Sequence, residues 1–303
     1  MVDAAAQATR CGFVALIGAP NAGKSTLLNA LVGSKISIVT PKVQTTRALI
    51  RGIAMEGEAQ LIFVDTPGIF APRRRLDRAM VGSAWSSTQD ADIVALLIDS
   101  PKGMQEDEEA ILRWLADVRA PKVLVFNKID LIEKPKLLAL AQSLNERISF
   151  GATFMICARS GDGVADLKAY FAAHVPPGPW LYPEDQISDA PLRQLAAEIT
   201  REKLYLRLHQ ELPYQSTVET EVWKELKDGA VRIEQTIYVE RESQRKIVLG
   251  KGGATIKSIG ADARKDIAEI IEQPVHLFLF VKVRENWGED PDRYREMGLE
   301  FPT

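Results

Sequence analysis

The strongest chemical signal in the sequence is the run Gly-Ala-Pro-Asn-Ala-Gly-Lys-Ser at residues 18–25. It matches the pattern G-x-x-x-x-G-K-S/T, in which glycines let the backbone curl so that its N–H groups point at phosphate oxygens. A predicted strand at 13–17 precedes it and a predicted helix at 25–32 follows it, which disfavours a chance glycine-rich turn. We expect Lys24 to reach the β- and γ-phosphates and Ser25 to hold Mg²⁺. The predicted phosphate site comprises Gly18, Ala19, Pro20, Asn21, Ala22, Gly23, Lys24, Ser25 and Thr26.

A second polar group, Asp65-Thr66-Pro67-Gly68, follows a predicted buried strand at 61–64. Open parallel sheets bind ligands at the carboxyl ends of their strands, which is where this group lies. We expect Asp65 to bind Mg²⁺ through water and the Gly68 N–H to meet the γ-phosphate. Thr66 and Pro67 complete this part of the nucleotide site. The alternative is an Asx turn without a ligand.

The tetrapeptide Asn-Lys-Ile-Asp at residues 127–130 ends the predicted strand at 123–126. Guanine presents two donors on one edge, and a carboxylate at Asp130 accepts both, whereas adenine has an acceptor at N1. Asn127 can bond N7 of the base and tie its loop to the phosphate loop, and the Lys128 stem can cover the base face. Taken alone, the tetrapeptide is a weak indicator of guanine binding. The prediction of a guanine nucleotide therefore depends on its position after the two earlier motifs.

These three motifs, in order on three predicted strand ends, resemble those of the Ras-like, translation-factor-related GTPases over residues 10–175. The resemblance implies Mg²⁺-dependent hydrolysis of GTP to GDP. The family's fifth motif, Ser-Ala-x, falls on Cys157-Ala158-Arg159, and the sequence departs from it at Cys157 and Arg159. In the family the backbone N–H of the Ala meets guanine O6, which Ala158 can still supply. The departure from the motif therefore affects the expected affinity for the base, and not which base is expected to bind.

The loop at residues 33–47 is rich in hydroxyl side chains and has no clear period. Such a composition suits a segment that becomes ordered when γ-phosphate and Mg²⁺ are present. By similarity to GTPases with a Thr-Thr-Arg motif here, Thr46 is expected to be the second protein ligand of Mg²⁺, beside Ser25. It is expected to act in catalysis together with Lys24 and Gly68. The alternative is an exposed Thr at the start of a strand.

Ile69 occupies the place where Ras-type enzymes carry a Gln that positions the attacking water. An isoleucine can neither orient nor polarise water, so we expect slow intrinsic turnover and completion of the site by other groups or by a partner. Asn21 lies where some relatives bind K⁺ through an Asn, and its alternative role is to cap the loop. The run 73–75 of three arginines either contacts phosphate or RNA or forms a solvated face.

Alternating apolar runs and amphipathic segments predict the elements of the first half, and this alternation is typical of a doubly wound parallel sheet. Glu-Gly-Glu at 56–58 indicates a hairpin between segments 47–55 and 59–64, so one strand is expected to be antiparallel. Other strands are expected at 13–17, 93–98, 123–126 and 154–156, and helices at 27–32, 76–87, 107–118, 136–148 and 164–173.

Residues 175–183 contain four prolines and a glycine, which cannot continue a helix or a strand. We therefore expect a first domain at 1–175, a proline-rich linker at 176–190 and a second domain at 191–303. The second domain has the predicted order helix, strand, strand, helix, helix, strand. These elements are expected at 191–208, 216–223, 231–240, from 246, 254–271 and 275–283.

Gly-Lys-Gly-Gly at residues 250–253, between two predicted helices, fits the GXXG loop of KH domains, and the element order resembles the type II arrangement. Such a loop lets a nucleic-acid backbone approach closely. Residues 240–265 carry seven Lys or Arg against three Asp or Glu, a net charge of +4. A helix–turn–helix connector with solvated cations is the alternative. The predicted RNA contacts are Arg241, Arg245, Lys246, Gly250, Lys251, Gly252, Gly253 and Lys257.

A P-loop GTPase, a proline-rich linker and a C-terminal type II KH domain resemble the Era family over almost the whole chain. The runs 182–189, 198–203 and 211–214 are also similar to that family. The resemblance implies a doubly wound mixed α/β sheet followed by a smaller α+β domain. It implies a bacterial GTPase that binds 16S ribosomal RNA near its 3′ end and assists maturation of the 30S subunit. It also implies a cytoplasmic protein with some peripheral contact to the inner membrane, and we expect a monomer.

The composition is that of a globular protein, with 303 residues, 46% hydrophobic and a net charge of −3. This charge argues against a wholly basic nucleic-acid coat but leaves room for a local basic site. Two cysteines exclude a disulfide framework and a four-ligand zinc site, and we expect neither a signal peptide nor a membrane span. Two other functions stay open: a membrane-peripheral signalling GTPase whose C-terminal domain binds a protein, and a KH module that does not hydrolyse its nucleotide.

Overall fold

The structure is a computed structural model that describes residues 9–42, 45–72, 74–208, 212–285 and 287–302. The chain forms two compact units. The first comprises Met1–Ile36, Thr46–Asp189 and Gly298–Thr303, and the second comprises Ser37–Thr45 and Ala190–Met297. Each unit therefore includes a short segment that lies far along the chain from its main part.

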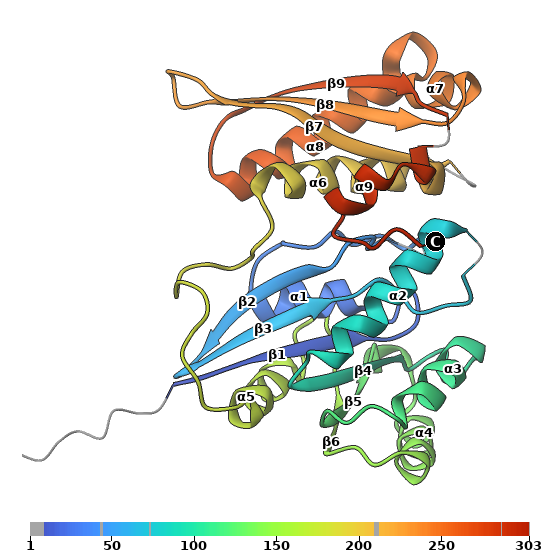
Figure 1. The fold of residues 1–303 in the computed structure, drawn as a ribbon, viewed down its shortest axis with the longest axis vertical. Coiled ribbons are helices and arrows are strands. Elements are labelled where there is room, and N and C mark those ends of the chain that lie inside the picture. Colours follow the sequence, from blue (N-terminus) through green and yellow to red (C-terminus); the bar gives the residue numbers. More distant parts are fainter. Residues whose placement is uncertain (1–8, 43–44, 73, 209–211, 286, 303) are drawn as a thin grey trace, which may run out of the picture. The chain divides into compact units, whose positions relative to one another are not determined.

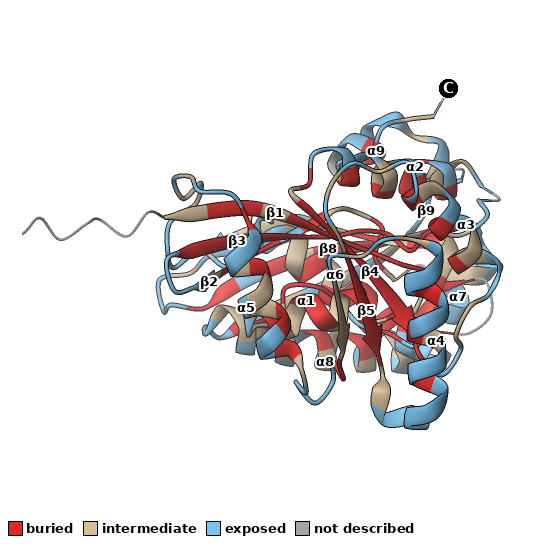
Figure 2. Ribbon diagram, turned by 90° about the horizontal axis from the view of Figure 1, so that it is seen from below, coloured by how far each residue is buried: buried red, intermediate tan, exposed pale blue. Residues whose placement is uncertain are grey.

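A six-stranded mixed sheet forms the centre of the first unit, in the order β2-β3-β1-β4-β5-β6 (Figure 1). Its strands are parallel except β2, which pairs antiparallel with β3, as the hairpin prediction requires. Every residue of β3 and of β4 is buried, as their near-continuous apolar sequences predict (Figure 2). The strands are β1 (Arg10–Ile17), β2 (Ile50–Glu56), β3 (Ala59–Asp65), β4 (Ile93–Asp99), β5 (Lys122–Asn127) and β6 (Ala152–Met155).

Helices cover both faces of this sheet, so the predicted doubly wound fold is confirmed. One face packs against α1 (Lys24–Val32) and α5 (Val164–His174). The other face packs against α2 (Arg75–Gln89), α3 (Glu106–Leu115) and α4 (Lys134–Arg147). The apolar residues of β1 alternate between these two cores, with Val14 and Leu16 in one and Ala15 and Ile17 in the other.

The segment after residue 175 first contacts the start of β1, through Cys11 and Pro176, and reaches the outer edge of β2 only at residues 187–189. The Ile53 N–H donates to the Ile187 carbonyl at 2.9 Å, and Gly52 forms an isolated bridge with Ser188. Arg51 and Asp189 form an ion pair at 3.0 Å. These contacts satisfy backbone groups of an edge strand that would otherwise be open to pairing with another chain.

Three helices pack on one face of a three-stranded sheet in the second unit, in the order β7-β8-β9 (Figure 1). β7 and β8 are antiparallel, whereas β9 is parallel to β8. The predicted order helix, strand, strand, helix, helix, strand is confirmed. The elements are α6 (Leu192–Arg207), β7 (Ser216–Glu225), β8 (Val231–Val239), α7 (Glu242–Leu249), α8 (Ala254–Ile271) and β9 (Val275–Val283).

Several elements differ from the sequence prediction, among them the starts of α7 and β2 and one helix that was not predicted. α7 begins at Glu242 rather than at 246, because the Gln244 side chain accepts hydrogen bonds from the N–H groups of Glu240 and Arg241 and caps the helix. β2 begins at Ile50 rather than at 47. A short helix, α9 (Pro291–Glu296), was not predicted, because six residues are too few to show a helical period.

Candidate functional site

The phosphate loop joins β1 to α1 with glycines at the two places where a side chain would not fit. A Cβ on Gly23 would lie 2.1 Å from Nδ2 of Asn127, and one on Gly18 would lie 2.6 Å from the Leu97 carbonyl oxygen. Lys24 is buried, and its Nζ donates to the carbonyls of Gly18 at 2.9 Å and Ala19 at 3.1 Å. The loop is therefore closed around the ammonium group that is predicted to meet phosphate.

Three side-chain oxygens converge beside this loop. Ser25 Oγ donates to Asp65 Oδ2 at 2.6 Å and lies 2.9 Å from Thr46 Oγ1, which in turn is 3.4 Å from Asp65 Oδ2. Thr46 and Asp65 are buried. Two hydroxyls and a carboxylate form the oxygen donor set that Mg²⁺ prefers, so these residues fit that ion. The structure thus brings together the three residues predicted to hold Mg²⁺, and Thr46 is not the exposed strand residue of the alternative.

The segment after β3 packs directly against the phosphate loop. Thr66 donates its hydroxyl to the Leu16 carbonyl at 2.8 Å, and a Cβ on Gly68 would lie 2.9 Å from Pro20. Ile69 donates its N–H to the Gly18 carbonyl at 3.2 Å, and its side chain is buried in the sheet core. Position 69 therefore supplies packing rather than a polar group for an attacking water.

The predicted base site is formed by the ends of β5 and β6. Asn127 Nδ2 donates to the Ala22 carbonyl at 2.9 Å, which confirms the expected tie to the phosphate loop and leaves its second N–H for N7 of a base. Asn127 Oδ1 accepts from the Ala158 N–H at 3.0 Å. This N–H would have to be shared to reach guanine O6. Asp130 is exposed in a short 3₁₀ turn, so its carboxylate is open to a ligand, and Cys157 is buried.

Asp99 is a further residue of this site that was not predicted from the sequence. It ends β4, is almost fully buried, and accepts a 2.6 Å hydrogen bond from Lys128 Nζ, which also donates to the Asn21 carbonyl at 2.7 Å. The Lys128 stem is thereby fixed between two loops. Asp99 could have been predicted from its position at the end of a strand, because Asp65 and Asn127 also end strands of the same sheet.

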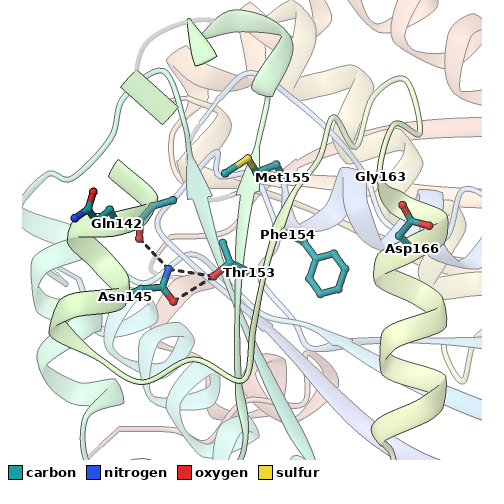
Figure 3. A pocket seen from close by; sticks show the side chains of 8 residues that line it. Gln142, Asn145, Thr153, Phe154, Met155, Gly163 and Asp166 are labelled. Atoms are coloured by element: carbon teal, nitrogen blue, oxygen red, sulfur yellow. Dashed lines mark hydrogen bonds between the residues drawn. The ribbon is translucent and has the colours of Figure 1, made fainter. Parts of the chain in front are cut away.

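A separate pocket of about 500 Å³ lies at the edge strand β6, between α4 and α5 (Figure 3). The figure shows Asn145 of α4 hydrogen-bonded to Thr153 of β6, and the amide nitrogen lies 3.1 Å from the hydroxyl. The described residues that line the pocket are Ala141, Gln142, Asn145, Thr153, Phe154, Met155, Gly163 and Asp166. They include none of the predicted nucleotide contacts, so this pocket is not the nucleotide site.

In the second unit, the Gly-Lys-Gly-Gly loop forms the tight connection between α7 and α8. Gly250, Gly252 and Gly253 have φ values of 72°, 60° and 78°, in the left-handed region that favours glycine. A Cβ on Gly250 would lie 2.2 Å from Thr255 Oγ1. Lys251 and Gly252 are exposed, so the loop presents a cation and bare backbone to solvent.

The predicted cations around this loop differ in availability. Arg241, Lys246 and Lys257 are exposed. Arg245 is half-buried, since its guanidinium donates to Glu242 at 2.9 Å and to the Val281 carbonyl at 3.3 Å. Arg245 therefore has less freedom to reach a phosphate than the other predicted contacts.

A groove of about 370 Å³ lies between β9 and α8, the helix that follows this loop, and it was not predicted from the sequence. β9 is an edge strand, so one side of its backbone faces the groove. Phe278 and Phe280 are 45% and 48% exposed, which is unusual for aromatic residues, and the Arg232 guanidinium lies 5.0 Å from the ring centroid of Phe278. The groove is lined by Ile256, Lys257, Gly260, Ala261, Arg264, Leu277, Phe278, Leu279 and Phe280.

Comparison with protein families finds two matches that correspond to the two units. Residues 13–128 match a family model described as 50S ribosome-binding GTPase, and residues 211–288 match the KH domain model. The chain is 72% identical over 302 residues to GTPase Era of Afipia carboxidovorans, which covers 100% of this chain and 98% of that protein. The chain belongs to the Era family of GTPases.

Other Era proteins support this assignment. GTPase Era of Bradyrhizobium diazoefficiens is 72% identical over 295 residues, covering 97% of this chain and 96% of that protein. A crystal structure of an Aquifex aeolicus Era variant bound to GDP·AlF₄⁻ is 36% identical with a TM-score of 0.90, covering 96% of this chain and 99% of that chain. Era in complex with MgGDPNP and nucleotides 1506–1542 of 16S ribosomal RNA is similar to the same degree and with the same coverage.

Of the three arginines at 73–75, Arg74 is the N-cap of α2 and Arg75 is its first residue. Arg73 lies outside the described residues. The guanidinium of Arg75 lies 5.0 Å from the ring centroid of Phe301, a cation–π contact within the first unit. Arg75 is therefore engaged with the C-terminal segment rather than being a purely solvated side chain.

Among the described helices, none is both long and apolar enough to cross a membrane.

Burial of Lys24 gives nucleotide binding an expected pH dependence. Burial lowers the pKa of Lys24 to about 8, although Asp65 and Glu108 oppose this shift. Bound phosphates favour the charged form, so binding takes up a proton when the pH exceeds about 8. GTP affinity should therefore fall by up to about tenfold per pH unit above that value. Titrations from pH 7 to pH 9.5 measure the slope, and Lys24→Arg, which stays charged, should lack it; equal slopes in both proteins would contradict this role.

Proposed function

We propose that this protein binds GTP with Mg²⁺, hydrolyses it slowly, and binds 16S ribosomal RNA near its 3′ end to assist assembly of the 30S subunit. The observation that carries the proposal is the presence of both sites in one chain: converging Ser25, Thr46 and Asp65 oxygens, and an exposed Gly-Lys-Gly-Gly loop beside a groove. The Era structure that contains MgGDPNP and 16S RNA resembles this chain over both units.

On the nucleotide side, Lys24 neutralises negative charge on the β- and γ-phosphates, and the Gly68 N–H contacts the γ-phosphate. Bound Mg²⁺ neutralises charge that develops on the phosphate oxygens. Ser25 and Thr46 hold this ion with their hydroxyls, and Asp65 holds it through water. Asp130 accepts both guanine donors. Because Ile69 is buried, no side chain at that position orients water, and slow turnover follows.

On the RNA side, the loop glycines let a phosphate backbone approach while Lys251, Lys246 and Lys257 neutralise it. Bases then lie in the groove between α8 and β9. Phe280 and the face of Phe278 away from Arg232 offer stacking surfaces there, and the β9 backbone offers hydrogen-bonding groups. Single-stranded RNA fits this arrangement, since its bases are free to leave the helical stack.

We also propose that K⁺ stimulates hydrolysis through Asn21. Asn21 adopts a positive φ of 65° in the phosphate loop, and its carbonyl is fixed by Lys128 at 2.7 Å. Its side-chain oxygen is a suitable ligand for a monovalent cation, which would add positive charge where other GTPases use an arginine. Turnover should be faster in K⁺ than in Na⁺ at equal ionic strength. Equal rates in the two salts would contradict the proposal.

Crosslinking in cells followed by sequencing of the bound RNA tests the proposed function, repeated with a GTP-locked variant. We expect reads concentrated at the 3′ end of 16S RNA. Absence of enriched RNA, together with a stable protein partner, would favour the signalling GTPase instead. Single-turnover hydrolysis with Mg²⁺ distinguishes both of these functions from a module that only binds nucleotide.

We further propose a cytoplasmic monomer whose contact with the inner membrane is peripheral.

A further inference from the structure

The segment Ser37–Thr45 precedes β2 in the chain but belongs to the second unit. Its described residues, 37–42 and 45, are called the turn, and three of them hydrogen-bond to one another. Thr45 Oγ1 lies 2.7 Å from Thr40 Oγ1 and donates to the Lys42 carbonyl at 2.8 Å, and the Lys42 N–H donates back to Thr40 Oγ1 at 3.2 Å. The loop predicted to respond to nucleotide therefore has a defined conformation at its described residues.

This turn is held by polar side chains of α6. The Val39 N–H donates to the Glu202 carboxylate at 3.0 Å, and Arg201 Nη2 donates to the Thr45 carbonyl at 2.5 Å. These contacts bind the backbone of the turn rather than its side chains. They therefore fix where the chain runs just before Thr46.

A cation of the turn reaches the C-terminal end of the same helix. Lys42 Nζ donates to the carbonyls of Tyr205 and Leu208, which belong to the last turn of α6 and its C-cap. The last carbonyls of a helix lack partners within the helix and carry negative partial charge. Lys42 therefore completes α6, and α6 anchors the turn at both of its ends.

Arg201 is placed to act on Thr45 because its other contacts leave it little freedom. The side chain is 1% exposed, and its guanidinium donates to both carboxylate oxygens of Glu198 and lies 5.0 Å from the Tyr205 ring centroid. Burial disfavours its charged form, but Glu198 and Tyr205 outweigh this effect and raise the pKa of Arg201. The guanidinium is thus a permanently charged and oriented donor.

The same helix is joined to the helix that carries the RNA groove. Lys203 pairs with Asp266 and Arg207 pairs with Asp262, and both carboxylates belong to α8. α8 begins at the Gly-Lys-Gly-Gly loop and lines the groove. α6 is therefore fixed to α8 by ion pairs as well as by packing.

We propose that Arg201 is a positioning residue for Thr46, and that Arg201, Glu202 and Lys42 together form a latch that holds the turn before Thr46 in the conformation that binds Mg·GTP. Thr46 follows Thr45 by one peptide bond, about 3.8 Å between Cα atoms, so holding the Thr45 carbonyl restricts the hydroxyl that lies beside Ser25 and Asp65. The inference rests on the proposed function, since it takes Thr46 to be a Mg²⁺ ligand in the GTP state.

The experiment measures affinities of full-length protein for GDP and for a non-hydrolysable GTP analogue over a range of Mg²⁺ concentrations. Arg201→Lys keeps the charge but cannot bind Glu198 through two nitrogens and reach Thr45 as well. Lys42→Met removes the hydrogen bonds from the turn to the Tyr205 and Leu208 carbonyls and leaves every residue of α6 unchanged. It therefore provides the test if Arg201→Lys folds poorly. We expect each variant to lower the affinity for the GTP analogue by about tenfold and to raise the Mg²⁺ concentration that analogue binding requires. GDP affinity should stay unchanged.

Two reference variants make the outcomes distinct. Lys227→Met, in the exposed turn between β7 and β8, removes the same charge and should change neither affinity. Thr46→Ala should mimic the latch variants. If Thr46→Ala leaves the Mg²⁺ requirement unchanged, the proposed role of Thr46 fails. The latch is overturned, and the proposed function stands, if Thr46→Ala raises the Mg²⁺ requirement while Arg201→Lys and Lys42→Met do not. The same conclusion follows if Arg201→Lys and Lys42→Met lower the affinities for GDP and for the analogue equally.

Discussion

Replacing Asp130 by Asn should change the preferred nucleotide from GTP to XTP. The carboxylate is exposed and accepts both donors of guanine, so its loss leaves those donors poorly matched. Two hydrogen bonds to a charged group, at roughly 1.5–3 kcal/mol each, correspond to a loss of about 10²- to 10⁴-fold in GTP affinity. The Asn amide can instead donate to the C2 carbonyl of xanthine. Competition among GTP, XTP and ATP measures the change.

A matched control lies three residues further along the same loop. Glu133→Gln removes an exposed negative charge that pairs with Lys136 and has no predicted contact with the base. It should leave the nucleotide preference as in the unaltered protein. A GTP preference that survives Asp130→Asn would show that Asp130 does not read the base.

Replacing Lys251 and Gly252 together by Asp should weaken RNA binding by about 100-fold while GTP affinity of the free protein stays intact. The change places two carboxylates where a phosphate backbone is expected, a shift of three charges at about 1 kcal/mol each, or about 100-fold. Folding should be preserved, because no atom lies within 4 Å of a Cβ at Gly252 and Asp tolerates positive φ. The salt dependence of the remaining RNA binding should also flatten, by about 0.7 in slope for each lost phosphate contact.

The control for that variant is a charge change elsewhere in the second unit. Lys224→Asp with Lys227→Asp, on the exposed hairpin between β7 and β8, alters the net charge by at least as much but lies outside the predicted RNA contacts. It should bind RNA with a much smaller loss. Unchanged RNA affinity after Lys251→Asp with Gly252→Asp would remove the KH loop from the RNA site.

Much of the fold and of the nucleotide site could be predicted from the sequence because both follow from local patterns. Buried parallel strands read as short apolar runs, and each motif directly follows one of them, so sheet topology brings Asp65 and Asn127 to the phosphate loop. The same holds for the glycine loop between α7 and α8, where positive φ values require glycine. Local spacing was sufficient in each of these places.

The parts that escaped prediction depend on contacts between distant residues. Phe278 and Phe280 fit the pattern of an ordinary strand, and only the observation that β9 ends the sheet shows a groove beside them. Arg201 sits in an amphipathic helix that predicts a solvated face, yet it is buried against Thr45, which lies 156 positions earlier. Periodicity identifies which face of a helix is polar but not what covers it.

A guanine-nucleotide site and an RNA site in one chain should influence each other's affinity. To test this, a labelled RNA from the 3′ end of 16S ribosomal RNA is titrated into the protein with a GTP analogue, with GDP and without nucleotide, and nucleotide is titrated with and without that RNA. We predict tightest RNA binding with the GTP analogue, and an increase in analogue affinity by RNA of the same factor, as linkage requires. Equal RNA affinity in all three states would reduce the protein to two tethered binding domains, and no binding of this RNA in any state would contradict the proposed function.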